Sequence, residues 1–239
     1  TGALGQDGKI LSNFLIKKNY IVYGIIKKLN SPTIKGVIYK KINLSDKNKF
    51  KKFLLKVNPF CLVHLGSENP NYFEEKQESF FEKNLRSTNF LIKYFSTYQP
   101  KQKLIIIGSS QMFKRNIKKI NLKTKFNPYN SYGRFRVSSY KFMMKNKKKY
   151  KSNIVMAILF NHDSEFRNKK FLLPRIIKMI KIKKIDQLKE IYLENISGDY
   201  SHADDICLGL YKLILYKKNI NKIIFSSKKK TYINNIIRL

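Results

Sequence analysis

The chain opens on Thr1-Gly2-Ala3-Leu4-Gly5-Gln6-Asp7-Gly8, and the interpretation of the fold starts from this stretch. Its glycines stand at positions 2, 5 and 8, which allows a tight turn whose backbone a phosphate group can approach closely. Residues 9–18 carry apolar side chains at three-and-four spacing and predict a helix that points its N-terminus at the turn. The glycine spacing alone also fits an ordinary tight turn. The strand and helix pattern that follows favours dinucleotide binding.

Beyond residue 18, short apolar segments alternate with longer amphipathic ones, which is typical of βαβ units. The predicted strands are residues 20–26, 37–43, 61–65, 103–107, 154–159 and 222–225. The predicted helices, besides 9–18, are residues 47–56, 81–98, 131–148 and 203–216. This order predicts an α/β fold, a Rossmann-like doubly wound parallel sheet with a small, incomplete C-terminal substrate-binding part. We expect residues 1–160 to form the dinucleotide-binding domain and residues 161–239 to hold the substrate-binding segment with the last helix and strand of the sheet.

A glycine turn of this kind normally follows a buried strand, and no strand precedes Thr1. A parallel sheet without its first central strand leaves hydrogen-bonding groups open on the neighbouring strands. We therefore expect the natural chain to begin before Thr1 and to supply that strand.

The composition is that of a folded, strongly basic protein. Hydrophobic residues make up 43% of the 239 residues, which excludes a disordered tail. The net charge of +35 would suit a nucleic acid or an anionic membrane surface. However, only seven of the 50 basic residues are arginine, the residue that base and phosphate recognition favours, and the lysines are spread along the whole chain. We interpret the charge as a lysine-rich solvated surface that helps to attract an anionic nucleotide, and we expect no specific nucleic acid and no membrane as partner. Lysines are densest in residues 145–151 and 178–184. These two segments leave binding to a nucleic acid or an anionic membrane surface open as the other interpretation.

Neither the cysteines nor the histidines indicate a special site. Cys61 and Cys207 lie far apart in apolar stretches, which suits two reduced core thiols better than a disulfide. Together with the three histidines they follow no metal-ligand spacing, so no metal site is predicted. The longest apolar stretches, such as residues 155–160, are too short to span a bilayer, and no leader opens the chain. We expect a cytoplasmic protein.

The end of the predicted strand 20–26 indicates which dinucleotide is bound. Folds that prefer NAD place an Asp or Glu there for the ribose hydroxyls. In this chain the strand ends in Lys27 and Lys28, with no acid nearby. Two cations suit a 2′-phosphate, so NADP is predicted in preference to NAD.

Two further motifs predict chemistry. Tyr132 and Arg136 stand four residues apart, on one face of a predicted helix. A neighbouring cation favours the ionised phenol, so such a tyrosine can exchange protons with a sugar hydroxyl or a carbonyl. Ser109, Ser110 and Gln111 follow the strand 103–107, at the sheet edge where open α/β folds bind their ligands.

In this order the motifs resemble those of the extended short-chain dehydrogenases/reductases, in the NAD-dependent epimerase/dehydratase family, and are most similar to the GDP-mannose 4,6-dehydratases. Residues 1–8, with the Gln-Asp pair, look like the opening cofactor motif of that family. Residues 158–164, Ile-Leu-Phe-Asn-His-Asp-Ser, with Arg167 and Phe171 after them, are similar to its substrate-binding segment and are the most specific part. Residues 199–205 resemble the stretch that opens a later helix. The family continues beyond the strand and turn that residues 223–225 resemble, so we expect the natural chain to extend past residue 239.

The resemblance implies a lyase with an internal hydride shuttle. NADP would accept hydride from C4 of the mannosyl ring, a base would remove the C5 proton, water would leave from C6, and hydride would return to C6. The product would be GDP-4-keto-6-deoxymannose. The resemblance also implies a homodimer or homotetramer. It places catalytic roles on Tyr132, Ser109, Gln111 and Arg136, and substrate binding on Ser110, Asn161 and Arg167. The implied cofactor-binding residues are Gly2, Gly5, Gln6, Asp7, Gly8, Lys27, Lys28, Leu65, Asn84, Tyr132 and Arg136.

Three positions depart from the family's pattern. Arg136 stands where the family has lysine, and Gln111 stands where it has the glutamate that removes the C5 proton. A neutral amide cannot accept that proton. Gly198 replaces an arginine that usually precedes the Asp199 match. Two alternatives therefore stay open beside the dehydratase: a nucleotide-sugar reductase or epimerase, which needs no C5 base, and a catalytically impaired NADP-binding paralogue.

Overall fold

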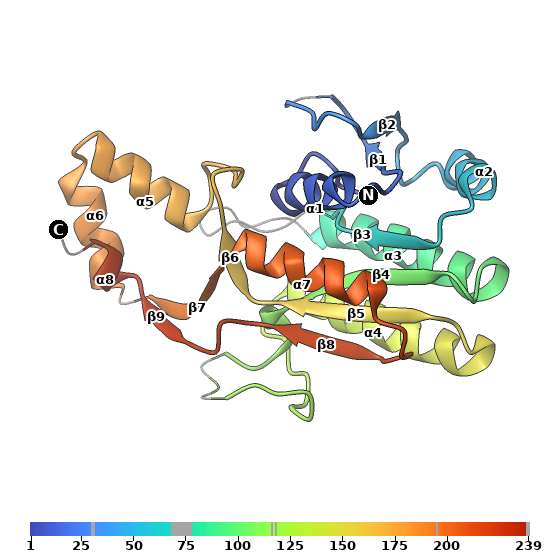
Figure 1. Ribbon diagram of the computed structural model, residues 1–239. Helices are drawn as coiled ribbons and strands as arrows, with labels where there is room; N and C mark the ends of the chain where they lie inside the picture. Colours follow the sequence, from blue (N-terminus) through green and yellow to red (C-terminus); the bar gives the residue numbers. More distant parts are fainter. Residues whose placement is uncertain (30–31, 68–77, 116, 118, 195, 238–239) are drawn as a thin grey trace.

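The computed structural model describes residues 1–239 except 30–31, 68–77, 116, 118, 195 and 238–239 (Figure 1). Its main sheet has four parallel strands in the order β3-β4-β5-β8. These strands are β3 (Cys61–His64), β4 (Lys103–Ser109), β5 (Ile154–Leu159) and β8 (Lys222–Phe225). A second parallel pair consists of β1 (Tyr23–Ile26) and β2 (Ile38–Lys41). The predicted parallel α/β fold is confirmed, with each of β1, β2 and β3 shorter than the segment predicted for it.

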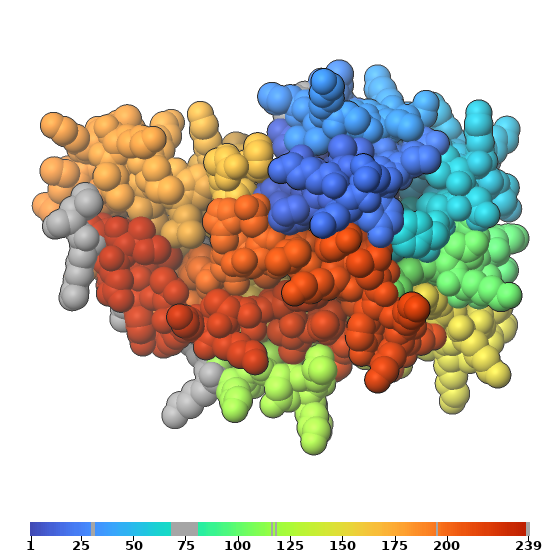
Figure 2. All heavy atoms as spheres, in the orientation of Figure 1, coloured from blue at the N-terminus to red at the C-terminus, as the bar shows by residue number. Residues whose placement is uncertain are grey.

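Helices cover both faces of the main sheet. On one face lie α1 (Gln6–Lys17) and α7 (Ala203–Leu215), and on the other lie α2 (Lys47–Val57), α3 (Glu78–Tyr98) and α4 (Ser131–Tyr150). Figure 2 shows the first layer from outside, where α1, in blue, lies against α7, in orange.

Strands β4 and β5 are shared by two hydrophobic cores. Side chains alternate across a strand, so Leu104 and Ile106 pack with α2, α3 and α4, whereas Ile105 and Ile107 pack with α1 and α7. All six residues of β5 are buried in the same alternating way. This double burial explains why both strands appear as continuous apolar runs.

Thr1 and Gly2 link the two parallel pieces of sheet. The backbone nitrogen of Thr1 donates a hydrogen bond to the carbonyl of Val63 at 2.8 Å, and Leu65 N–H donates to the Thr1 carbonyl at 3.3 Å. On the other side, Gly2 N–H donates to the carbonyl of Ile25 at 3.1 Å. These two residues therefore occupy the position between β1 and β3 where the sequence predicts a central strand.

A smaller unit follows β5. Strand β6 (Asn161–Asp163) pairs with β7 (Ser197–His202), which pairs antiparallel with β9 (Lys230–Tyr232). Helices α5 (Leu172–Lys181), α6 (Ile185–Leu193) and α8 (Asn234–Ile237) pack into a separate core around Ile176 and Ile233. Figure 1 shows this unit at one end of the main sheet. The boundary at residues 160/161 stays a prediction.

The remaining expectations concern cysteines and membranes. Both cysteines are free thiols; Cys207 is buried and Cys61 is half-buried. Burial raises the pKa of the Cys61 thiol to about 12, so that thiol is unreactive at neutral pH. Within the residues that the structure describes, no helix is long and apolar enough to cross a membrane.

Candidate active site

Two of the three glycines in the opening turn are required by close packing. Gly2 has φ +71°, in the left-handed region, and a Cβ on it would lie 2.7 Å from the backbone nitrogen of Gly66. A Cβ on Gly8 would overlap the carbonyl oxygen of Gly2 and lie 2.7 Å from Cα of Ala3. The first turn of α1 therefore packs directly on the loop, and Gly5, between these two glycines, is exposed.

The N-terminus of α1 suits an anion. Its N-cap residue, Gly5, makes no side-chain capping hydrogen bond. Backbone N–H groups at a helix start, together with the positive end of the helix dipole, stabilise a phosphate placed there. An exposed glycine at an uncapped helix N-terminus fits the pyrophosphate of a dinucleotide.

A buried ion pair ties this helix to the segment after β5. Nε2 of His162 lies 3.0 Å from Oδ1 of Asp7, and Nδ1 of His162 lies 2.7 Å from the carbonyl of Phe160. Gln6 donates to Asp7 and to the His162 carbonyl, and accepts a hydrogen bond from the hydroxyl of Ser164. The predicted cofactor residues Gln6 and Asp7 thus use their side chains to hold the predicted substrate segment.

The charges of this pair follow from its contacts. Burial acts to raise the pKa of Asp7, but the charge and hydrogen bond of His162 outweigh it, and the pKa falls below its usual 3.8. Burial likewise acts to lower the pKa of His162, but the charge and hydrogen bond of Asp7 raise it above its usual 6.5. The raised pKa favours the protonated ring, in which Nε2 donates to Asp7 and Nδ1 donates to the carbonyl of Phe160.

Tyr132 and Arg136 form the second part of the site. Nη2 of Arg136 donates to the Tyr132 hydroxyl at 2.9 Å, as their spacing on α4 predicts. Nη1 donates to the carbonyl of Ile107 in β4 at 2.7 Å. Only 2% of Arg136 and 6% of Tyr132 is exposed, so the phenol is held against a desolvated cation. The ring of Phe81 packs edge-on against Tyr132 from α3.

Ser109 and Gln111 lie beside this pair because of one glycine. A Cβ on Gly133 would overlap the carbonyl oxygen of Gln111, so α4 approaches the turn after β4 at backbone contact. The amide of Asn130 donates to Oε1 of Gln111 at 2.7 Å, while its own oxygen caps α4 through the N–H of Gly133. Ser109 accepts a hydrogen bond from Gln111 N–H at 3.2 Å.

All of these groups lie at one edge of the sheet. Ser109 ends β4, Asn161 follows β5, and Gly66 follows β3 while contacting Gly2 of the opening turn. Since the strands are parallel, their carboxyl ends lie at the same edge. The structure therefore brings together the glycine turn, the tyrosine with its arginine, and the serine turn.

The other predicted site residues lie around these groups and are less directly connected to them. Asn84 is buried on α3, one turn beyond Phe81, and Leu65 hydrogen-bonds Thr1. Ser110 begins the short 3₁₀ turn after β4, and Lys27 and Lys28 are exposed after β1. Arg167, predicted to contact substrate, pairs with Asp163 at 3.0 Å and stacks on the ring of Phe171, while Asn161 is exposed.

The sequence interpretation did not identify three residues of the site. Asn130 holds Gln111, Ser67 accepts a hydrogen bond from Arg136, and His162 pairs with Asp7. Asn130 had a readable signal, because an Asn immediately before a helical pattern is a typical N-cap. Ser67 and His162 had none, since each contacts a residue more than 60 positions away.

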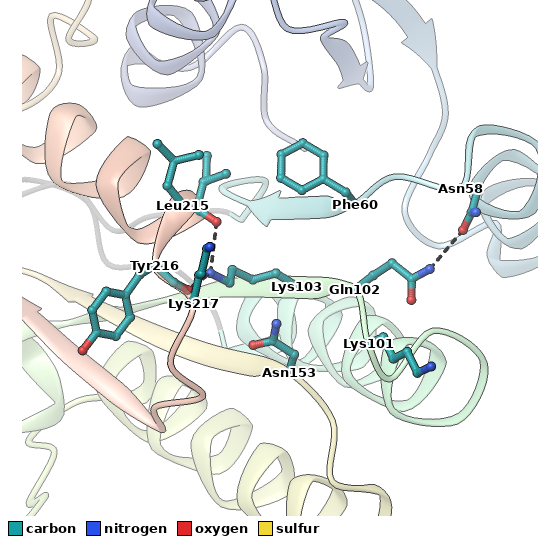
Figure 3. A pocket seen from close by; sticks show the side chains of 10 residues that line it. Asn58, Phe60, Lys101, Gln102, Lys103, Asn153, Leu215, Tyr216 and Lys217 are labelled. Atoms are coloured by element: carbon teal, nitrogen blue, oxygen red, sulfur yellow. Dashed lines mark hydrogen bonds between the residues drawn. The ribbon is translucent and has the colours of Figure 1, made fainter.

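A separate hollow of about 540 Å³ lies at the opposite edge of the sheet (Figure 3). Its lining includes Phe60, Lys103 and Asn153, which stand where β3, β4 and β5 begin. Nζ of Lys103 donates to the carbonyls of Leu213, Ile214 and Tyr216, at the end of α7. All three ammonium protons are thereby used, and we interpret Lys103 as a structural cap of that helix.

The fold of this chain is similar to the folds of solved structures. A dTDP-glucose 4,6-dehydratase of Bacillus anthracis, solved in complex with NAD, matches with a TM-score of 0.83 at 12% identity, covering 99% of this chain and 77% of the other. A UDP-glucuronic acid 4-epimerase of Bacillus cereus, solved with UDP-glucuronic acid and NAD, matches with a TM-score of 0.82 at 18% identity, covering 98% and 79%. The fold is thus that of the NAD-dependent epimerase/dehydratase class of short-chain dehydrogenases/reductases.

Sequence comparison narrows this class. The family model described as GDP-mannose 4,6 dehydratase matches residues 1–239, and the chain belongs to that family. A GDP-mannose 4,6 dehydratase of Dictyostelium discoideum is 26% identical over 91% of this chain and 67% of its own length. The human GDP-mannose 4,6 dehydratase is 25% identical over 90% of this chain and 63% of its own length. The chain thus spans about two thirds of the length of these curated relatives.

Proposed function

We propose that the protein is a nucleotide-sugar 4,6-dehydratase that converts GDP-mannose to GDP-4-keto-6-deoxymannose with a nicotinamide dinucleotide regenerated in place. The observation that carries the proposal is the hydrogen bond from Arg136 to the Tyr132 hydroxyl, at the sheet edge that the opening glycine turn also reaches. Family membership supports the substrate, and solved relatives in complex with NAD support the class of cofactor.

The proposed cofactor site uses the opening turn and its helix. Gly2 and Gly8 let the turn pack closely against Gly66 and α1, and the pyrophosphate would lie at exposed Gly5, at the N-terminus of α1. Lys27 and Lys28 follow β1 as exposed cations and favour NADP, because a 2′-phosphate needs positive charge where NAD-binding sites carry a carboxylate. The nicotinamide ring, when bound, supplies a reversible hydride acceptor.

The proposed work of the chain's own residues is proton transfer and orientation. Tyr132 takes the proton of the sugar C4 hydroxyl, and the fixed charge of Arg136 stabilises the phenolate that this reaction needs. The hydroxyl of Ser109 accepts from Gln111 N–H and keeps its own proton to donate to the sugar oxygen. Asn161 and Arg167 are the proposed substrate contacts from the segment after β5.

A second candidate function is a nucleotide-sugar reductase or epimerase. Gln111 is the observation that favours it, since its Oε1 already accepts from Asn130 and an amide cannot take the C5 proton. Either reaction requires Tyr132 and Ser109. A dehydratase requires in addition a base other than Gln111.

The test is to incubate the purified protein with GDP-mannose and NADP and to measure a 4-keto product by its absorbance in alkali. The proposal predicts product with the native protein and none with Tyr132→Phe. Failure to form product, combined with NADPH consumption on a 4-keto-6-deoxy sugar nucleotide, would reject the dehydratase in favour of the reductase. Tight NADP binding with neither activity would reject both reactions and leave a binding protein.

A further inference from the structure

The guanidinium of Arg136 has a third partner outside the residues discussed as catalytic. Its Nη2 donates to the hydroxyl oxygen of Ser67 at 2.6 Å as well as to Tyr132. Nη1 donates to the carbonyl of Ile107. The Arg136 side chain thus reaches from α4 across the end of β4 to Ser67, in the loop after β3.

These three bonds fix the orientation of a planar group. Nη2 carries two protons in the guanidinium plane, and with one directed at Ser67 the other is directed at the Tyr132 hydroxyl. The Ile107 carbonyl fixes the opposite nitrogen. Without the Ser67 oxygen, the plane can rotate about its bond to the Ile107 carbonyl and move the second Nη2 proton off the phenol.

Ser67 is itself held by the glycine turn. Its N–H donates to the carbonyl of Leu65 at 2.9 Å, and Gly66 between them contacts the backbone of Gly2. Leu65 in turn hydrogen-bonds Thr1. A continuous chain of contacts therefore runs from the proposed phosphate turn through Ser67 to Arg136 and the Tyr132 hydroxyl.

We propose that Ser67 is a positioning residue of the active site, which orients the Arg136 guanidinium so that Nη2 points at the Tyr132 hydroxyl. This inference rests on the proposed catalytic role of Tyr132. It also accounts for how an arginine can serve next to the tyrosine: a lysine ammonium is compact, with three rotatable donors, and needs no second acceptor to direct one of them, whereas a planar fork does.

The kinetic test compares Ser67→Ala with Ser67→Thr, which restores a hydroxyl, and with Ser87→Ala, which removes a hydroxyl that bonds only backbone carbonyls of α3 among its described contacts. Misdirecting a catalytic group typically costs one to two orders of magnitude in rate, so we expect kcat to fall roughly tenfold or more in Ser67→Ala. KM for the sugar nucleotide should stay unchanged, Ser67→Thr should recover most of kcat, and Ser87→Ala should behave as the native protein. An unchanged kcat in Ser67→Ala, or a change confined to KM, would overturn the proposal.

A double-mutant cycle isolates the path through Arg136. In an Arg136→Lys background the fork is absent, so Ser67→Ala should have no further effect on kcat. Full additivity of the two substitutions would mean that Ser67 acts by another route and would overturn the inference.

A spectroscopic measurement keeps this test independent of the reaction. The chain has seven arginines, so selective ¹⁵N-arginine labelling gives few guanidinium signals, and Arg136→Lys assigns one of them. We expect slowed rotation of the Arg136 guanidinium in the native protein and in Ser67→Thr, and faster averaging in Ser67→Ala. Equal rotation rates in all three would overturn the role of Ser67 even if turnover is normal. Absence of turnover in the native protein would reject the proposed function while leaving this measurement interpretable.

Discussion

Gln111 accepts a 2.7 Å hydrogen bond from the side-chain amide of Asn130, the residue that caps α4 one position before Ser131. The same Asn130 oxygen receives the N–H of Gly133, so a single amide links the serine turn to the helix that carries Tyr132. The side chain at position 111 is thus held in place from the tyrosine's own helix.

Gln111→Glu should fit this position and add a base to it. A glutamate oxygen can accept the same hydrogen bond from Asn130, so the fold should be unchanged, while the second oxygen becomes able to take a proton. We expect dehydration of GDP-mannose to rise by about 100-fold if proton removal at C5 limits the native protein. Gln111→Leu is the matched control, with no gain. An equal rate in native protein and Gln111→Glu would show that another group already serves as base.

Tyr132→Phe should abolish turnover and leave the fold intact. The ring packs against Phe81 and Phe135, and phenylalanine keeps those contacts while removing the oxygen that Arg136 contacts. We expect kcat to fall by about 100-fold or more, with NADP affinity within a factor of two or three of the native value. Turnover assays and cofactor titration by fluorescence measure the two quantities. Retained turnover would remove Tyr132 from the mechanism.

Gly8→Ala should destabilise the turn more strongly than Gly5→Ala. A Cβ at position 8 would overlap the Gly2 carbonyl oxygen, whereas at position 5 its nearest neighbour, the same oxygen, lies 3.3 Å away. Forced overlap in a packed region costs about 1–3 kcal/mol or more. Urea unfolding should therefore show a clearly lower midpoint for Gly8→Ala than for Gly5→Ala. Similar midpoints for both variants would mean that the turn can relax.

The Asp7–His162 pair makes folding stability depend on pH in a defined direction. The folded pKa of His162 lies above its ordinary 6.5, so its stabilising contribution is complete below about pH 6.5 and is lost as pH rises through the folded value. The folded pKa of Asp7 lies below 3.8, so its contribution is present above 3.8 and is lost as pH falls through the lower value. The pair is therefore most stabilising between these limits.

His162→Asn tests this dependence. Melting temperatures of native protein and variant should differ most near pH 6 and converge toward pH 9. His202→Asn is the comparison, because His202 also pairs with an aspartate, Asp204 at 3.7 Å, but both side chains are more than half exposed, so solvent screens that pair. A difference between native protein and His162→Asn that is constant from pH 6 to pH 9 would contradict the ionised pair.

Lys103→Met should lower stability without altering the proposed active site. The substitution keeps most of the aliphatic stem but leaves the carbonyls at the end of α7 without their donor. Unsatisfied buried acceptors cost about 1–3 kcal/mol, and partial access of water through the hollow in Figure 3 limits the loss. Lys101→Met, in the same hollow, is the control. Equal unfolding midpoints for the two variants would rule out a capping role.

Much of the fold was readable from the sequence because β4 and β5 are buried on both faces and therefore appear as unbroken apolar runs. The predicted strand 222–225 coincides with β8, and α7 begins at the predicted Ala203. Helix α1 begins at Gln6, three residues earlier than expected, because the glycines lowered the apparent helical pattern of its first turn.

The smaller unit was harder to predict. Strands β6 and β9 have three residues each, too few for an alternating pattern to appear. Helix α5 is strongly amphipathic, but its lysines resembled the general lysine background of the chain. At the site, the Tyr132–Arg136 contact followed from helical spacing, whereas Ser67 and His162 depend on tertiary approach of distant segments, which spacing does not encode.

The double role of β4 and β5 gives the molecule two layers of packing, one on each face of the main sheet. Because Ile105 faces one layer of helices and Ile106 the other, a substitution at either position changes the direct packing of one layer only. Changes on the face of α7 that packs on the sheet therefore leave the direct contacts of α4, the helix that carries Tyr132, as they are.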